Sequence, residues 1–63
     1  MQTYVTLVWH CINPAFRDDW SDTVIYAGPD KGQAVSAIEK CDIVGHFRIQ
    51  VWIDGKFEYE EQH

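Results

Sequence analysis

The sequence predicts an α+β fold, a ββαββ chain whose four-stranded, mainly antiparallel sheet carries one helix on one face. Two stretches, residues 3–11 and 47–53, alternate side chains with period two, which is typical of strands. Between them, residues 34–41 repeat apolar side chains at helical spacing. The length of 63 residues, without a repeat or a linker, predicts a single small domain over 1–63.

The first strand is expected over residues 3–11, where Val5, Leu7 and Trp9 share one side of the alternation. We expect this side to face the core. Asn13-Pro14 ends the strand, because proline supplies no donor to the ladder and biases the residue before it away from regular structure.

Residues 13–22 are mostly polar and predict a loop, although Phe16 and Trp20 lie within it. Residues 23–27 predict a short second strand, because they are rich in side chains that favour strands. Gly28-Pro29 then closes it.

Asp30 is the predicted N-cap of the helix, with Gln33 three residues later as the partner in a capping box. The apolar stripe of this helix consists of Ala34, Ala37, Ile38 and Cys41. Small side chains allow the helix to lie close to the sheet. Gly45, in the exit turn, suits a left-handed conformation.

Residues 46–60 predict a β-hairpin around the turn at 54–55. A two-residue turn would pair Ile53 with Lys56 and Val51 with Glu58. That register would place charged side chains among the core aliphatic residues, so it is disfavoured.

A three-residue loop with Gly55 left-handed in a bulge avoids this problem. It pairs Val51 with Phe57 and Ile49 with Tyr59. The outer face then holds the compatible pairs Arg48–Glu60, Gln50–Glu58 and Trp52–Lys56. We predict this bulged register.

One helix cannot cover both faces of the sheet, so the other face stays partly open. The side chains expected on that open face include Tyr4, Val8, His10, Arg48, Trp52 and Lys56. Large aromatic side chains are seldom exposed without a use, so this face is the first candidate for contact with a partner.

The net charge of −5, from ten acidic and five basic residues, disfavours direct binding of nucleic acid because phosphates would be repelled. Apolar stretches are too short for a membrane span, and no signal-peptide pattern appears. We therefore expect a cytoplasmic protein in which Cys11 and Cys41 are reduced and buried.

No pattern indicates a catalytic centre, a cofactor or a metal site. His10 and Cys11 are adjacent on a strand and point to opposite faces, while Cys41 and His46 lie on either side of a turn. Neither pair offers the close spacing of a zinc site. The serines and the carboxylates have no neighbouring base or pKa-shifting partner in the sequence, so we expect no enzyme.

Acidic and aromatic residues occur together in the loop and in the last strand, which favours binding to a basic protein surface. The candidate partner-binding residues are Phe16, Asp18, Asp19, Trp20, Asp22, Trp52, Glu58, Glu60 and Glu61. A solvated loop and a charged edge strand that prevents aggregation would also produce this pattern.

The sequence therefore predicts a small acidic, non-enzymatic interaction or inhibitor protein. Its partner would be a protein with a basic surface, such as a groove that normally holds nucleic acid, where carboxylates would lie in place of phosphates. In size and charge alone the chain resembles phage-encoded inhibitors of host defence, including anti-CRISPR proteins. The alternative is a structural or regulatory homo-oligomer that pairs through the open face or an edge strand.

Overall fold

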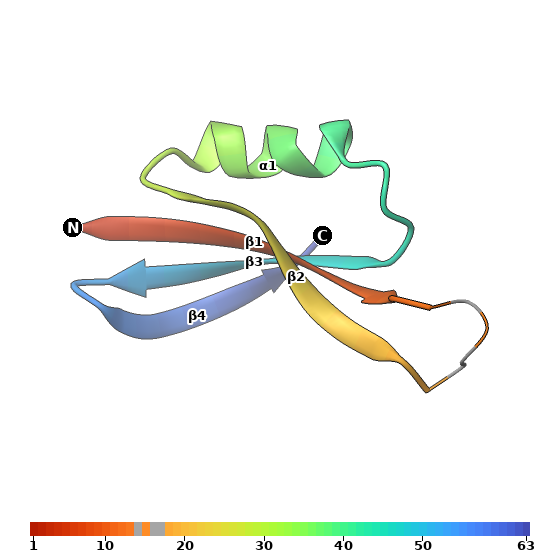
Figure 1. The fold of residues 1–63 in the computed structure, drawn as a ribbon. Helices are drawn as coiled ribbons and strands as arrows, with labels where there is room; N and C mark the ends of the chain where they lie inside the picture. The colour runs from red at the N-terminus through yellow and green to blue at the C-terminus, as the bar shows by residue number, and fades with distance from the viewer. Residues whose placement is uncertain (14, 16–17) are drawn as a thin grey trace.

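The computed structural model describes residues 1–13, 15 and 18–63 (Figure 1). Its elements are β1 (Gln2–Cys11), β2 (Trp20–Gly28), α1 (Lys31–Lys40), β3 (His46–Ile53) and β4 (Lys56–Gln62). The strand order is β2-β1-β3-β4, all neighbouring strands are antiparallel, and α1 lies over one face only. The predicted ββαββ arrangement is confirmed.

β2 begins three residues earlier than predicted, at Trp20. The antiparallel ladder with β1 continues through Ser21 opposite His10 to Trp20 opposite Cys11. Polar side chains are tolerated there because β2 is an edge strand. The loop prediction is therefore wrong for residues 20–22, while the described residues between Cys11 and Trp20 belong to no helix or strand. Phe16 lies outside the described residues.

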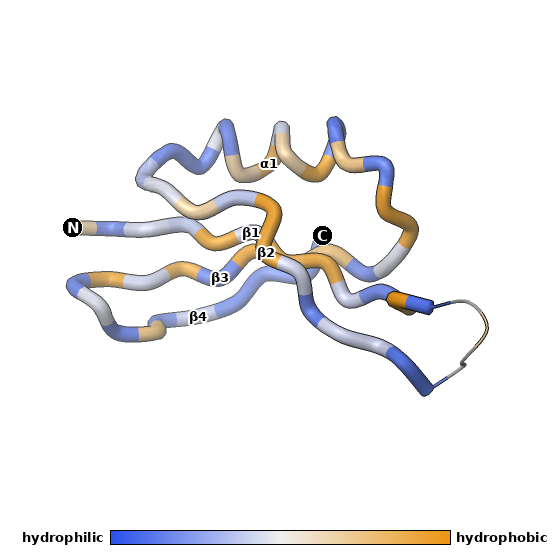
Figure 2. Tube along the Cα trace, viewed as in Figure 1, coloured by the Kyte–Doolittle hydropathy of each residue, from blue (hydrophilic) through white to orange (hydrophobic). Residues whose placement is uncertain are grey.

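The core lies between α1 and the side of β1 that carries its even-numbered residues. Thr6 and Val8 are buried there, and the Thr6 hydroxyl donates a hydrogen bond of 3.0 Å to the carbonyl oxygen of Ala34. Ile49 and Val51 are buried on the same face. Figure 2 shows apolar segments along β1 and β3, whereas β4 is mainly hydrophilic.

The predicted core side of β1 is therefore wrong, because Leu7 and Trp9 lie on the face away from the helix. The odd-numbered face, with Val5, Leu7 and Cys11, is the more apolar of the two, so the hydropathy of β1 alone points to the wrong side of the strand. Thr6 is compatible with the core because the carbonyl group of Ala34 satisfies its hydroxyl.

The predicted helix cap is confirmed. Asp30 is the N-cap of α1, and its carboxylate accepts a hydrogen bond of 3.2 Å from the backbone N–H of Gln33. α1 packs on β1 and β2. No helix among the described residues is long and apolar enough to cross a membrane.

Gly45 does not adopt the left-handed conformation expected for it, because Gly55 is the one described glycine with positive φ. It is required instead for a close approach between the α1–β3 connection and β1. A Cβ added at Gly45 would overlap the carbonyl oxygen of Trp9 and lie 2.9 Å from the Cβ of His10.

Cys11 and Cys41 form no disulfide with each other, and both are half-buried. The expected full burial is therefore wrong. Cys41 lies at the C-cap of α1, where its sulfur accepts a hydrogen bond of 3.4 Å from the backbone N–H of Ile43. The Cys11 thiol donates a hydrogen bond of 3.3 Å to the carbonyl oxygen of Asn13.

The β3–β4 hairpin has a different register from the predicted one. Asp54 and Gly55 have φ of 52° and 81°, the sign that a two-residue type I′ turn requires, and Ile53 pairs with Lys56. Glu58 is then an extra residue on β4, so that Val51 pairs with Tyr59 instead of Glu58. The predicted pairs of Val51 with Phe57, of Ile49 with Tyr59 and of the three outer-face positions are wrong.

This register avoids the burial of charge that disfavoured a two-residue turn. Ile53 is 38% exposed, so the lysine opposite it stays in contact with water. The bulge at Glu58 then restores an apolar partner for Val51. A similar bulge occurs on the other edge strand, where Ile25 is the extra residue of β2 opposite Thr6 and Leu7 of β1.

Gly55→Val is expected to lower the free energy of unfolding by more than about 1 kcal/mol. A Cβ at Gly55 would meet no atom within 4 Å, so the cost arises from the strain of a β-branched residue at positive φ. Urea denaturation measures it. Gly55→Asn is the control, because asparagine tolerates positive φ, and it should cost clearly less. Equal costs for the two variants would contradict the turn geometry.

Candidate partner-binding surface

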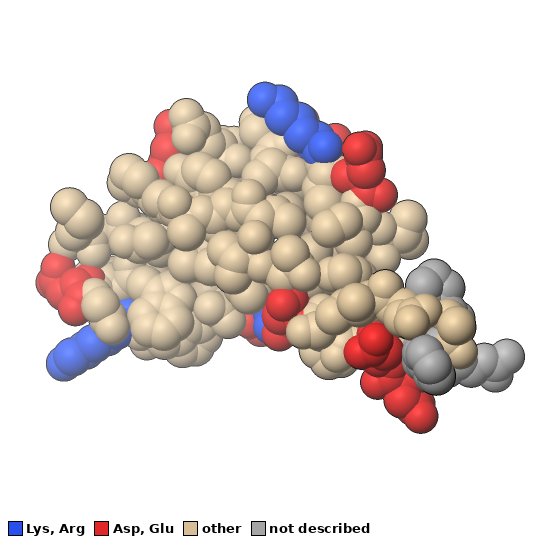
Figure 3. Space-filling view, viewed as in Figure 1, with Lys and Arg blue, Asp and Glu red and all other residues tan. Residues whose placement is uncertain are grey.

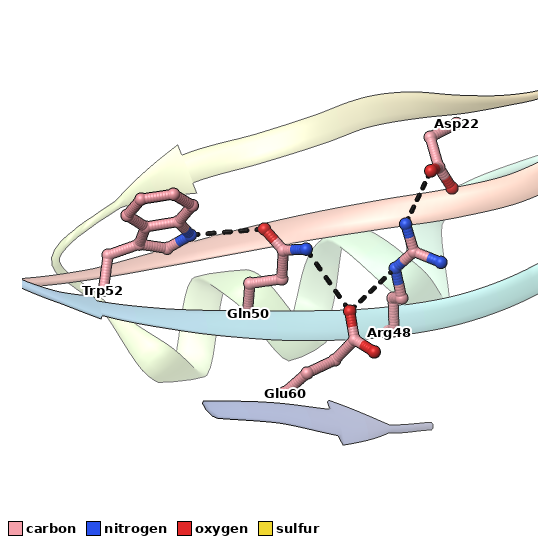
Figure 4. Close-up of polar contacts among 5 residues, drawn as sticks. All are labelled: Asp22, Arg48, Gln50, Trp52 and Glu60. Carbon is pink, nitrogen blue, oxygen red and sulfur yellow. Dashed lines mark hydrogen bonds and ion pairs between the residues drawn. The ribbon is translucent and has the colours of Figure 1, made fainter. Parts of the chain in front are cut away.

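A chain of polar contacts crosses the open face, defined here as the face of the sheet away from α1 (Figure 4). Arg48 of β3 donates a hydrogen bond of 2.6 Å from Nη2 to Oδ2 of Asp22 in β2. Its Nε lies 3.0 Å from Oε1 of Glu60 in β4, as an ion pair that is not aligned as a hydrogen bond. One guanidinium group therefore links three strands.

The series of polar contacts continues along the open face toward the β3–β4 turn. Gln50 donates a hydrogen bond of 3.3 Å to Glu60, and its side-chain oxygen accepts one of 3.2 Å from the indole N–H of Trp52. The Trp52 ring also meets Phe57 edge to face, with centroids 5.6 Å apart. The centre of the open face is thus covered by a polar network and its turn end by aromatic rings.

This network explains how the open face protects Leu7, which is only 8% exposed although no helix covers it. Arg48 is directly opposite Leu7 on the neighbouring strand. Arginine side chains cover apolar neighbours with their methylene groups while the charged end finds polar partners.

Two tryptophan rings stack at the other end of the open face. Trp9 of β1 and Trp20 of β2 have ring centroids 6.1 Å apart and an angle of 25° between their planes. They are diagonal neighbours, because Asp22 is the residue directly opposite Trp9. The two residues remain 39% and 40% exposed, so they offer a large aromatic surface to a partner.

Asp18 and His46 complete an open, shallow pocket around this stack, referred to below as the tryptophan pocket (Trp9, Asp18, Trp20 and His46). Its volume is about 470 Å³. His46 is directly opposite Trp9 on β3, and Asp18 is exposed in the β1–β2 connection. The pocket therefore combines two indole rings, one carboxylate and one imidazole, contributed by three strands and a loop.

The structure does not bring all of the predicted partner-binding residues onto one surface. Asp18 and Trp20 meet in the tryptophan pocket, and Asp19 is next to Asp18 in the chain. Figure 3 shows acidic side chains in separate groups rather than in one continuous patch. None of the described residues that line the tryptophan pocket comes from β4.

Three of these acidic residues already have basic partners. Asp22 and Glu60 both contact Arg48, whose single positive charge offsets one of their two negative charges. Glu61 is on the helix side, 3.7 Å from Lys31 at the start of α1. The other predicted residues are the bulged Glu58, which is exposed on the β4 edge, and Trp52, at the turn end of the open face.

A base and a hydroxyl group meet on the helix side of the sheet, where His10 Nε2 lies 2.7 Å from Thr23 Oγ1. In the described part of the chain, no hydrogen bond to the second ring nitrogen orients this histidine as a catalytic base. The described residues also contain no group of three or more His, Cys, Asp or Glu side chains placed to hold a metal ion.

The sequence interpretation missed Trp9 and His46 as site residues. It assigned Trp9 to the core and left His46 as an ordinary surface position of the last hairpin. One signal in the sequence could have indicated this site: a tryptophan lies on each side of the β1–β2 connection. If β2 is extended back to residue 20, Trp20 becomes the diagonal neighbour of Trp9.

Comparison of the chain with protein-family models, curated proteins and solved structures finds no match. The chemistry of the open face is therefore the best indication of what the protein binds.

Proposed function

We propose that this chain is a small non-enzymatic interaction protein that docks its tryptophan pocket on a basic surface of a protein partner. The observation that carries the proposal is the Trp9–Trp20 stack, in which both tryptophan residues stay about 40% exposed beside a carboxylate. Tryptophan is among the side chains most enriched at binding hot spots, where its ring becomes fully buried.

The charge of the chain favours a basic partner. Asp18 and Asp19 are exposed at the pocket end, and the whole chain carries a net charge of −5. Complementary charge accelerates association, while buried aromatic anchors slow dissociation. A basic groove that normally binds nucleic acid suits this arrangement, since carboxylates can take the place of phosphates. Inhibition of the partner would follow from occupying that groove.

The test compares two double charge reversals that change the net charge equally. Asp18→Lys with Asp19→Lys alters the pocket end, whereas Glu39→Lys with Asp42→Lys alters exposed residues at the end of α1. Each variant and the original chain are used to capture proteins from a cell lysate. The proposed partner is a protein retained by the original chain and by the α1 variant but lost by the pocket variant.

Association rates with that partner are then measured at several salt concentrations. The pocket variant should associate roughly tenfold to a hundredfold more slowly at low salt, with a weaker salt dependence. The α1 variant should stay close to the original chain. Equal rates for the two variants would contradict the proposed docking surface.

The alternative homo-oligomer predicts a different result in solution. Light scattering at increasing protein concentration should show a monomer if the open face binds a different protein and not a second copy of this chain. A stable dimer whose formation is abolished by the Asp18→Lys and Asp19→Lys reversals would assign the pocket to self-association instead.

A further inference from the structure

We infer that the tryptophan pocket binds the guanidinium group of an arginine side chain presented by the partner. This inference rests on the proposed function and specifies the chemistry of the group that the pocket recognises. It follows from three features of the pocket: the exposed ring faces, the charge beside them and the arrangement of the neighbouring Arg48 contact.

The first feature is the exposed aromatic surface of Trp9 and Trp20. Their planes lie within 25° of each other with centroids 6.1 Å apart, so the rings stack, and the two residues stay 39% and 40% exposed. The face of an indole ring is electron-rich and attracts a cation, and tryptophan is the best of the aromatic side chains in this respect. A flat guanidinium group can lie parallel to such a ring over its full area.

The second feature is the carboxylate of Asp18, which lines the pocket together with the indoles. Asp18 has no ion pair with any residue that the structure describes, in contrast to Asp22, which contacts Arg48. A guanidinium group lying on the rings can donate two parallel hydrogen bonds to a carboxylate. His46 adds a polar ring at the opposite side of Trp9.

The third feature is an arrangement of the same kind within the chain. Asp22 is directly opposite Trp9, and it already holds the guanidinium group of Arg48 at 2.6 Å. Carboxylate and guanidinium thus meet immediately beside the indole stack. Asp18 offers the same chemistry on the pocket side, to an arginine from outside the chain.

The pocket chemistry also discriminates against other ligands. A nucleobase can stack on tryptophan, but its phosphate groups would be repelled by Asp18 and Asp19. A lysine ammonium group is compact and strongly hydrated, so it gains less than a guanidinium group from a flat aromatic surface.

The test uses N-acetyl-arginine-N-methylamide as the probe, with its citrulline and lysine counterparts at equal ionic strength. Citrulline is the neutral isostere of arginine. The chain has three tryptophans, so NMR can follow the indole N–H signals of Trp9 and Trp20 with Trp52 as an internal control. The arginine probe should shift the two pocket signals saturably at millimolar concentrations, with the Trp52 signal nearly unchanged.

The expected preference is at least about tenfold for the arginine over the citrulline probe, and severalfold over the lysine probe. Asp18→Asn should weaken arginine binding by about tenfold, whereas the matched control Asp42→Asn, at the exposed end of α1, should leave it unchanged. Equal binding of the arginine and citrulline probes, or of the arginine and lysine probes, would overturn the inference. So would shifts at Trp52 as large as those at Trp9.

The failure of this inference and the failure of the proposed function give different results. If the arginine probe does not bind but the Asp18→Lys and Asp19→Lys reversals still slow association with the captured partner, the pocket docks on a basic surface without a dedicated arginine. If the reversals have no effect on the partner but the arginine probe binds as expected, the proposed function is wrong and the guanidinium site stands.

Discussion

Gly45→Ala is expected to lower the free energy of unfolding by more than about 2 kcal/mol. The added Cβ would overlap the carbonyl oxygen of Trp9 and lie 3.0 Å from Cγ2 of the buried Val8. Backbone atoms cannot rotate away as a side chain can, so the start of β3 must move relative to β1. Urea denaturation measures the loss of stability.

Gly32→Ala is the matched control. Gly32 is in the first turn of α1, where a Cβ would lie 3.2 Å from the carboxylate of Asp30, which can shift. The gain in helix propensity opposes this contact, so stability should change by less than about 1 kcal/mol in either direction. Similar effects of the two alanines would contradict the close approach at Gly45. The indole signal of Trp9 provides a second readout, since it should move in Gly45→Ala alone.

Ile49→Ala is expected to lower the free energy of unfolding by about 2–5 kcal/mol. Ile49 is only 1% exposed and is among the largest side chains buried on the helix side of the sheet. The substitution removes three carbon atoms and leaves a cavity beside Thr6, its partner on β1. In a chain of 63 residues this loss is a large part of the total stability.

Ile53→Ala tests the same chemical change at the end of the same strand. Ile53 faces the same side as Ile49 but is 38% exposed at the turn, so its truncation should cost less than about 1 kcal/mol. Chemical denaturation of both variants at low temperature gives the comparison. Equal costs would show that the core does not end before the β3–β4 turn.

The elements of the fold follow from local sequence signals, and this is why they could be predicted. The Asp30 cap marks the start of α1, and the alternation in β1 and β3 depends on neighbouring residues alone. The choice of the buried face is not local. Thr6 becomes a core residue only because Ala34, in the helix, offers its carbonyl oxygen.

The hairpin register shows the same difference between local and distant information. The positive φ of Gly55 could be predicted from the Asp54-Gly55 pair. The bulge at Glu58 could not be predicted, because it depends on tertiary burial. Lys56 can pair with Ile53 only because Ile53 is exposed at the turn, and Val51, which is buried, then needs the apolar Tyr59 as its partner. With the bulge, Glu60 faces Arg48 and Glu61 faces Lys31.

The candidate site was predicted in part. Asp18 and Trp20 were identified because acidic and aromatic residues occur together near them. Trp9 and His46 were missed, since their position depends on the faces of β1 and β3. The strand order also decides which acidic residues have a basic neighbour. Asp22 of β2 can reach Arg48 of β3 because only one strand, β1, lies between them.

Both edge strands of the sheet carry an extra residue, Ile25 in β2 and Glu58 in β4. A regular edge presents an even row of backbone donors and acceptors on which another chain can grow as a further strand, the first step of fibril formation. A bulge interrupts that row and twists the edge. The extra residues in both edge strands therefore disfavour lengthening of the sheet from molecule to molecule by strand addition.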